Sequence, residues 1–312
     1  MTPTFATSLR RSSGPVFVLA AMVAVIDGTA PPTVARGAQA GMGAASATIQ
    51  RLIEASGAEV AIAFRTLDGR DQLFVGPDVS FHAASTMKVP VMVELFRQAK
   101  AGALDLDAPL PVHNAFKSIV DGSPFTLQAD EDSDGVVYQH VGGTMTAREL
   151  CEHMITVSSN LATNLLIERL GVDNVRRTVE GLGAKGVVVR RGVEDDKAFQ
   201  QGLNNTTTAR GLLTLFEQIA DGAVVDQASS QAMVEILARQ HFRDGLPAGL
   251  PAGVRVAHKT GEITKIHHDG GIVFAERPYV IVVLVRGIAD RAVSARLIAD
   301  ISRALFEATN PA

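Results

Sequence analysis

The stretch Tyr279-Val-Ile-Val-Val-Leu-Val285 is a continuous apolar run rich in β-branched residues, and an amphipathic helical pattern follows it from Arg291 to Ala308. A run of this kind predicts a buried strand. Two further strand patterns precede it, at Val254–His258 and Gly271–Ala275, and another lies near the other end of the chain, at Val60–Arg65. Strands from both ends can therefore form one sheet, with the neighbouring helices on its faces.

The N-terminal part of this sheet has its own local pattern. A helix is expected from Ala47 to Ala55, and the strand at Val60–Arg65 is followed by a turn at Gly69-Arg-Asp71 and a second strand near Gln72–Val75. The predicted fold class is therefore α/β, of the α+β kind. It consists of an antiparallel five-stranded sheet flanked by terminal helices, joined to an all-helical lobe.

The long middle of the chain has helical periodicity. The predicted helices cover residues 85–101, 146–155, 160–170, 172–181, 207–220 and 227–239. We therefore expect one domain over residues 41–312, in which 41–84 and 240–312 form an α/β lobe and 85–239 form a helical lobe. A cleft between the two lobes would be a natural place for an active site.

Two features of this middle part have structural interpretations. Residues 109–144 contain three prolines, four glycines and the acidic cluster Asp130-Glu-Asp-Ser-Asp134, which predicts a solvated surface loop. Cys151 is the only cysteine, so an internal disulfide is excluded. Because it lies in an apolar helical pattern, we expect a buried structural thiol and not a nucleophile.

The start of the chain differs from the rest and predicts a secretory signal over residues 1–40. Arg10 and Arg11 precede an apolar run from Pro15 to Ile26, and Ala38-Gln-Ala40 offers small residues for cleavage. The run has about twelve residues, fewer than the roughly twenty that a stable membrane span needs. We expect the leader to be removed and the protein to be periplasmic or secreted. A disordered tail is the alternative interpretation.

Charge excludes one class of partner. The 312 residues carry a net charge of −4 with pI ≈ 6.1, and the basic residues are scattered along the chain. A basic stripe that could neutralise a phosphate backbone is absent from the sequence, so no nucleic acid is expected as a partner.

The first of three motifs with possible chemistry is Ser85-Thr-Met-Lys88, which an apolar helix follows. Side chains three positions apart share one helix face, and a serine hydroxyl needs such a neighbouring base to act as a nucleophile. About one Ser-x-x-Lys is expected by chance in a chain of this length. Taken alone, the motif fits a helix-start serine beside a solvated lysine equally well.

The other two motifs are Ser158-Ser-Asn160, between two predicted helices, and His258-Lys-Thr-Gly261, at the end of a predicted strand. In the second motif the first serine could relay a proton and the asparagine could bind a substrate amide, although both residue types also serve as helix caps. In the third, the lysine and the hydroxyl suit a carboxylate, and the glycine would let a substrate backbone approach the strand.

In this order the motifs resemble the Ser-x-x-Lys, Ser-Asp-Asn and Lys-Thr-Gly set of class A β-lactamases and penicillin-binding proteins. The resemblance extends over the whole predicted mature chain, because the order of helices and strands also follows the family. It implies that Ser85 is the nucleophile, that Lys88 is its activating partner and that Ser158 relays the proton.

The resemblance also implies how substrate binds. Asn160 would bind the acylamino group, and Lys259, Thr260 and Gly261 would line the site for the substrate carboxylate. The oxyanion hole would use the backbone N–H groups of Ser85 and Glu262. The family favours small residues at this last position, and the charge of a glutamate there would repel an anionic substrate.

Several residues depart from the family pattern. Ser159 stands where the common motif has aspartate. Class A enzymes deacylate with a glutamate on a loop ahead of a threonine-rich helix start, which makes Glu194, ahead of Asn205–Thr208, the natural candidate base. The family's asparagine four residues later is Ala198 here. The two aspartates that follow Glu194 are weaker substitutes, and Glu194 as a solvated loop carboxylate is the alternative.

An arginine that assists carboxylate binding from the strand after Lys-Thr-Gly in many family members is not evident. Lys265 or His268 would take that role. Adjacent histidines at 267 and 268 make a poor zinc site. We expect no metal and no organic cofactor.

The leading hypothesis is β-lactam hydrolysis through an acyl-enzyme on Ser85, with Glu194 directing water onto the ester. One alternative is a D-alanyl-D-alanine carboxypeptidase or a related serine amidase or esterase. Another is a penicillin-binding or sensing protein that stays acylated. In each case the expected partner is a small-molecule β-lactam or a peptidoglycan-like substrate, and the protein is expected to be a monomer.

Overall fold

The computed structural model describes Met1 and residues 32–311, and it describes the side chains of the folded body from Gly41 onward. Residues 2–31, which make up most of the predicted leader of residues 1–40, therefore lie outside the described residues. Helix α1 runs from Pro32 to Ser56, so it begins earlier than the helix expected at Ala47, and the predicted cleavage point after Ala40 falls inside it.

A five-stranded antiparallel sheet forms one part of the molecule and confirms the predicted fold class. Its strand order is β2-β1-β11-β10-β9. The strands are β1 (Glu59–Thr66), β2 (Gln72–Val75), β9 (Arg255–Ile263), β10 (Ile266–Phe274) and β11 (Tyr279–Arg286). Strands β1 and β11 pair with each other and so join the two ends of the chain. Glu59 lies opposite Arg286, and Thr66 lies opposite Tyr279.

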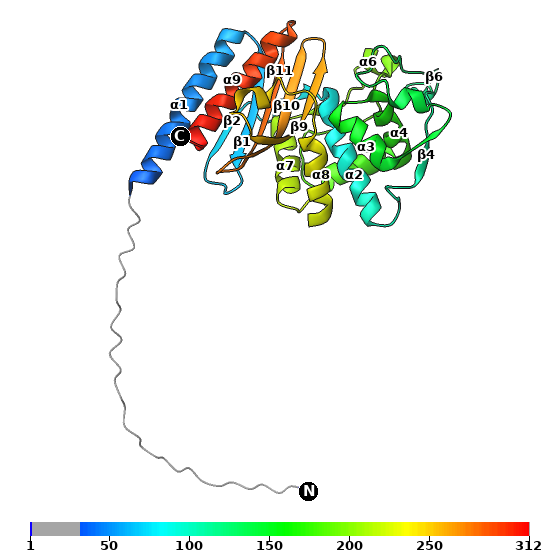
Figure 1. The fold of residues 1–312 in the computed structure, drawn as a ribbon, viewed down its shortest axis with the longest axis horizontal. Helices are drawn as coiled ribbons and strands as arrows, with labels where there is room; N and C mark the ends of the chain where they lie inside the picture. Colours follow the sequence, from blue (N-terminus) through cyan, green and yellow to red (C-terminus); the bar gives the residue numbers. More distant parts are fainter. Residues whose placement is uncertain (2–31, 312) are drawn as a thin grey trace.

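Alternating residues of β11 supply the cores on the two faces of this sheet. Ile281 and Val283 belong to the apolar cluster under α1 and the last helix, α9 (Arg291–Thr309), whereas Val282 and Leu284 belong to the larger cluster on the other face. Figure 1 shows α1 and α9 side by side against the sheet, with the remaining helices beyond its opposite face. The terminal helices thus flank the sheet, as predicted, and both lie on the same face.

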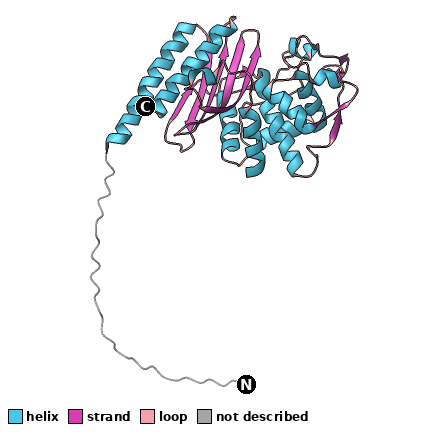
Figure 2. Ribbon diagram, viewed as in Figure 1, coloured by secondary structure: helices cyan, strands magenta, loops and turns pink. Residues whose placement is uncertain are grey.

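The remaining helices lie between β2 and β9 in the sequence. They are α2 (Lys88–Lys100), α3 (Ala147–Thr156), α4 (Asn160–Leu170), α5 (Val172–Gly181), α6 (Asp196–Gln200), α7 (Ala209–Ala220) and α8 (Gln227–Ala238). The longer ones match the predicted ranges to within a few residues, and only the short α6 was not expected. Helix α7 packs on β1, β10 and β11, and α8 packs on β9, so these two helices cover the second face of the sheet (Figure 2).

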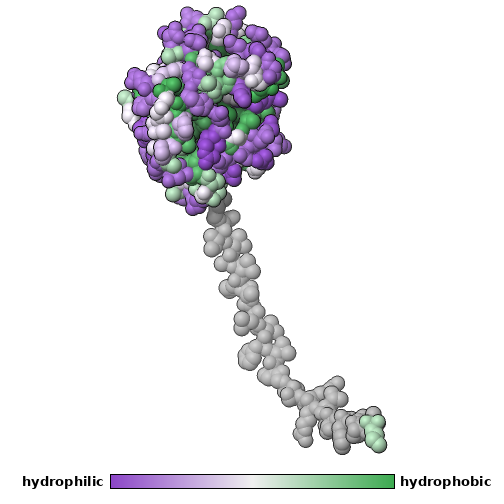
Figure 3. Space-filling view, turned by 90° about the vertical axis from the view of Figure 1, so that its right-hand side faces the viewer, coloured by the Kyte–Doolittle hydropathy of each residue, from purple (hydrophilic) through white to green (hydrophobic). Residues whose placement is uncertain are grey.

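Short paired strands lie within and next to residues 109–144, so the prediction of a solvated loop was only partly right. The pairs are β4 (Pro109–Pro111) with β7 (Thr144–Thr146), and β5 (Phe116–Lys117) with β6 (Pro124–Phe125). In Figure 3, which views the molecule from this end, hydrophilic residues are mixed with hydrophobic ones. The acidic cluster is not simply solvated, however, because Asp134 is buried and Asp132 is hydrogen-bonded inside the fold.

Two further sequence expectations concern burial. Cys151 is 1% exposed and lies in the larger apolar core, and this burial raises the pKa of its thiol far above the ordinary range. It is therefore the structural thiol that the sequence predicts. Within the described residues, no helix combines the length and the apolar character needed to cross a membrane.

Candidate active site

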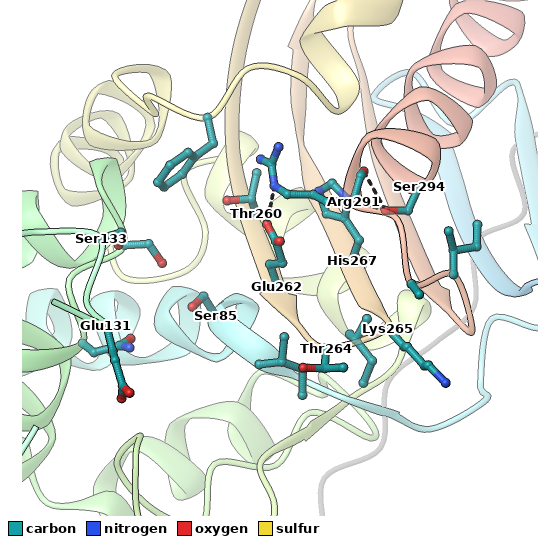
Figure 4. Close-up of a pocket in the computed structure, with 17 residues that line it drawn as sticks. Ser85, Glu131, Ser133, Thr260, Glu262, Thr264, Lys265, His267, Arg291 and Ser294 are labelled. Carbon is teal, nitrogen blue, oxygen red and sulfur yellow. Dashed lines mark hydrogen bonds and ion pairs between the residues drawn. The ribbon is translucent and has the colours of Figure 1, made fainter. Parts of the chain in front are cut away.

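Ser85 lies in a short 3₁₀ helix, η1 (Ala84–Met87), that leads directly into α2. Its neighbour Ala84 has φ +45°, a left-handed conformation that a residue with a Cβ rarely adopts. This tight entry leaves Ser85 half-buried at the wall of a cavity of about 570 Å³. Figure 4 shows the Ser85 side chain on the same cavity as Thr260 and Glu262 of β9.

Two buried lysines converge on the hydroxyl of Ser158. The Nζ atoms of Lys88 and Lys259 each lie 3.1 Å from Ser158 Oγ, and both lysine side chains are fully buried. Lys88 Nζ also donates to the Ser158 carbonyl at 2.5 Å and to Asn160 Oδ1 at 2.8 Å. Lys88, the predicted partner of Ser85, thus forms hydrogen bonds with Ser158 and Asn160 of the second motif. It lies three residues after Ser85 in the sequence.

Burial makes both lysines poor holders of a proton. Desolvation lowers the pKa of Lys88 to about 7, although the carboxylates of Asp132 and Glu194 oppose this. Desolvation and the charge of Lys88 also place the pKa of Lys259 well below its ordinary value. An amine with a pKa near neutrality can accept a proton from a hydroxyl at physiological pH, which a solvated lysine cannot do.

A carboxylate from outside the three motifs supports the second motif. Asp132 accepts hydrogen bonds from the backbone N–H groups of Asn160 and Leu161, at 2.9 and 3.0 Å, and from the Tyr138 hydroxyl at 3.1 Å. These N–H groups belong to the first turn of α4, where helix geometry leaves donors unpaired and favours a negative charge. Ser159, which replaces the family's aspartate, instead caps α4 by accepting from Ala162 N.

Strand β9 carries the third motif along one wall of the cleft. Lys259 points to Ser158, and Thr260 lines the cavity. Gly261 also has a role in packing. A Cβ atom there would lie 3.0 Å from Thr86 N and 3.2 Å from Ala83 O, which is tighter than most real Cβ contacts, so the glycine lets β9 pack closely against η1. This close packing fixes the strand relative to Ser85.

The cavity contains an arginine that the sequence analysis missed. Arg291, the first residue of α9, donates to Glu262 at 2.7 Å (Figure 4) and also pairs with Asp244 at 2.6 Å. Asp290 caps this helix and starts it beside the cleft. In the sequence, Arg291 is recognisable only as a basic residue directly after the Asp290 helix cap. That Arg291 lies next to β9 follows from the packing of α9, which the sequence pattern does not give.

Of the two residues expected in place of an arginine, only one lies at the cavity. Lys265 lines it. His268 is fully buried, donates from Nε2 to His82 O at 2.9 Å and accepts at Nδ1 from Val285 N. This desolvation lowers the pKa of His268 to about 4, so the ring is neutral and cannot anchor a carboxylate. Within the described residues there is also no cluster of histidine, cysteine or acidic side chains that could hold a metal.

Glu194 lines a second cavity, of about 290 Å³, together with Ser85 and Asn160. Its Oε1 accepts from Asn160 Nδ2 at 3.0 Å, so the same asparagine bridges Lys88 and Glu194. Desolvation and the neighbouring Asp196 carboxylate raise the pKa of Glu194. Its φ of +59° is a conformation that costs about 1–2 kcal/mol in a residue other than glycine.

The residues on either side of Glu194 hold this conformation. Asn164 of α4 accepts from Val193 N at 2.7 Å and donates to Val193 O at 3.0 Å. Asp195 is buried and caps α6. It is therefore a structural residue and not a substitute base, whereas Asp196 is exposed at a second cavity, which Ser85, Asn160 and Glu194 also line. Ala198, at the position of the family's asparagine, is buried and supplies no polar side chain.

Comparison with known families agrees with this arrangement. A model described as the β-lactamase enzyme family matches residues 44–309. The chain belongs to the β-lactamase enzyme family. The match extends over both the sheet and the helices, and it includes all three motifs.

Members of this family with similar sequences come from several bacteria. A β-lactamase of Rhodobacter capsulatus is 34% identical over 128 residues, which cover 41% of this chain and only 39% of that protein. The extended-spectrum β-lactamase PER-1 of Pseudomonas aeruginosa is 25% identical over 276 residues, 83% of this chain and 85% of that protein. Among solved structures, an acyl-enzyme complex of a PBP-A mutant with penicillin G has a TM-score of 0.73 at 29% identity, covering 86% of this chain and 97% of that chain.

Proposed function

We propose that this member of the β-lactamase family is a serine β-lactamase that hydrolyses the β-lactam amide through an acyl-enzyme on Ser85. The observation that carries the proposal is the convergence of two buried lysines on Ser158 Oγ beside Ser85, with Glu194 on the opposite side of Asn160. Hydrolysis through a Ser85 ester needs one base for acylation and one for deacylation, and Lys88 and Glu194, at the two ends of the Asn160 amide, support this assignment.

Acylation uses the lysine side of the site. Neutral Lys88 accepts the Ser85 proton as Oγ attacks the lactam carbonyl. The N–H groups of Ser85 and Glu262 stabilise the oxyanion. As the C–N bond breaks, Ser158 passes a proton to the leaving nitrogen and regains one from a buried lysine. Thr260 and Lys259 bind the substrate carboxylate, and Asn160 binds the acylamino group.

Deacylation uses the Glu194 side. The ionised carboxylate takes a proton from water, the water oxygen attacks the ester carbonyl, and the Ser85 oxygen leaves and is reprotonated. The raised pKa of Glu194 favours this role because a stronger base accepts the proton more readily. The hydrolysed product leaves with an added molecule of water, and the site returns to its starting state without a metal or an organic cofactor.

The proposal also covers where the substrate binds, the oligomeric state of the protein and its export. The substrate lies between an α/β lobe of residues 41–84 and 240–312 and a helical lobe of residues 85–239. The protein acts as a monomer, and residues 1–40 direct its export to the periplasm or beyond. The charged and apolar segments of that leader in the sequence support this part of the proposal.

The test is a stopped-flow time course with a chromogenic cephalosporin. We expect steady turnover by the wild type and a burst of one equivalent, followed by almost no turnover, for Glu194→Gln. The variant Ser85→Ala should lose all labelling by a fluorescent penicillin. A burst without turnover in the wild type would indicate a penicillin-binding protein. Labelling that persists in Ser85→Ala would reject the nucleophile.

A further inference from the structure

The β5–β6 hairpin of the 109–144 segment contacts the loop that carries Glu194. Its strands pair Phe116 with Phe125 and Lys117 with Pro124. The turn between them closes through Ser118 N, which donates to Ser123 O at 2.8 Å. Neither the three motifs nor the proposed reaction steps use this hairpin, so its contacts need another explanation.

Asp195 is the residue through which the hairpin contacts this loop. Ser118 Oγ donates to Asp195 Oδ1 at 2.8 Å, and Ile119 N donates to Asp195 Oδ2 at 2.9 Å. Ser118 and Asp195 are only 5% and 3% exposed. Although desolvation opposes it, these hydrogen bonds keep the pKa of Asp195 below its ordinary value. A buried carboxylate with such partners is costly to displace.

A second contact lies at the tip of the hairpin. Lys197 Nζ donates to Asp121 Oδ2 and to Ser123 Oγ, both at 2.7 Å. These groups are more open to solvent, so this contact contributes less than the buried one. Together the two contacts hold the chain immediately after Glu194 at positions 195 and 197.

Glu194 needs this support because its backbone is in a left-handed conformation, with φ +59°. Asn164 fixes the peptide before it through both polar atoms of Val193. The hairpin fixes the residue after it through Asp195. If either neighbour were released, Glu194 could relax to an ordinary conformation, and its carboxylate would leave its place beside Asn160.

We propose that the β5–β6 hairpin is a positioning element for deacylation, and that Ser118 acts through Asp195 to hold Glu194 toward the ester. This inference rests on the proposed role of Glu194. Ser118 is a positioning residue that touches no substrate. Its effect should be confined to the step that uses Glu194, because the lysine side of the site has no contact with the hairpin in the described structure.

The test compares Ser118→Ala with Ser118→Thr, which retains a hydroxyl. Loss of one buried hydrogen bond to a carboxylate should slow deacylation about tenfold in Ser118→Ala. The burst rate should not change, so kcat and KM should fall together and kcat/KM should stay constant. Ser118→Thr should restore at least half of the wild-type kcat.

A control separates positioning from general loss of stability. Ser302 is a fully buried serine of α9 that donates to Leu246 O at 3.0 Å, far from the Glu194 loop in the fold. Ser302→Ala should leave both the burst and the steady rate unchanged.

The outcomes distinguish this inference from the proposed function. If Glu194→Gln traps the acyl-enzyme but Ser118→Ala deacylates at the wild-type rate, the hairpin has no positioning role and the proposed function stands. The hairpin likewise has no such role if Ser118→Ala lowers kcat/KM as much as kcat. If Glu194→Gln turns over normally, Glu194 is not the base for deacylation, and both that step of the proposed mechanism and this inference are wrong, whereas a wild type that shows a burst without turnover would overturn the proposed function itself.

Discussion

Replacing Asp132 by asparagine tests how a residue outside the three motifs supports them. The aspartate accepts two backbone N–H groups of α4 and the Tyr138 hydroxyl. A hydrogen bond to a charged group contributes about 1.5–3 kcal/mol, and a neutral one about 0.5–1.5 kcal/mol. Asparagine retains one oxygen for the two N–H groups, so each bond loses about 1 kcal/mol. We expect the free energy of unfolding to fall by about 2 kcal/mol.

The same substitution should change the pH dependence of acylation. The Asp132 carboxylate raises the pKa of Lys88 against the stronger effect of desolvation. Without that negative charge, the pKa of Lys88 falls further, and the neutral amine persists to lower pH. The midpoint of the acylation rate against pH should therefore move to lower pH in Asp132→Asn.

Two measurements check these expectations. Thermal unfolding should show a loss of about 2–4 °C for each kcal/mol, and stopped-flow burst rates across the neutral pH range should give the midpoint. Asp130→Asn is the matched control, because Asp130 is an exposed acid of the same cluster. An unchanged midpoint in Asp132→Asn, or an equal shift in Asp130→Asn, would refute the reasoning.

Two further predictions concern the same cleft. In the wild type, the burst rate should rise with pH around a midpoint near 7, because protonated Lys88 cannot accept the Ser85 proton; a midpoint near that of a solvated lysine would contradict the role of Lys88. Glu262→Ala keeps the backbone N–H but removes one of the two carboxylates on Arg291. It should raise kcat/KM for anionic β-lactams roughly two- to fivefold at low salt, with a smaller gain at high salt. A gain that does not depend on salt would argue against an electrostatic cause.

Hydrophobic periodicity predicted most of the fold because the core follows it. The strand expected at Val60–Arg65 is one residue shorter than β1 at each end. The helix expected from Arg291 to Ala308 begins where α9 begins and ends one residue before it. Strand β10 was recognised only in its second half. Its first half contains His267, His268 and Asp269, which are polar in sequence but buried, with their hydrogen bonds supplied by other segments. The polar residues therefore concealed the first half of this strand.

In the candidate site, likewise, some residues could be predicted from the local sequence and others could not. Ser85 and Lys88 are neighbours on one turn, so their proximity follows from local structure. Asp132 and Arg291 come from a loop and a distant helix start, and only tertiary packing brings them to the cleft. Their residue types gave no indication of these contacts, because an acidic cluster and a basic residue after a cap are both common on surfaces.

The pairing of β1 with β11 determines when the sheet can form during synthesis of the chain. These strands lie near opposite ends of the sequence, and α1 packs on α9, which ends at Thr309. The sheet therefore cannot close until nearly all of the polypeptide has emerged from the ribosome. A nascent chain lacking its last strand and helix has no partner for the apolar edge of β1, and must be kept from aggregating until synthesis is complete.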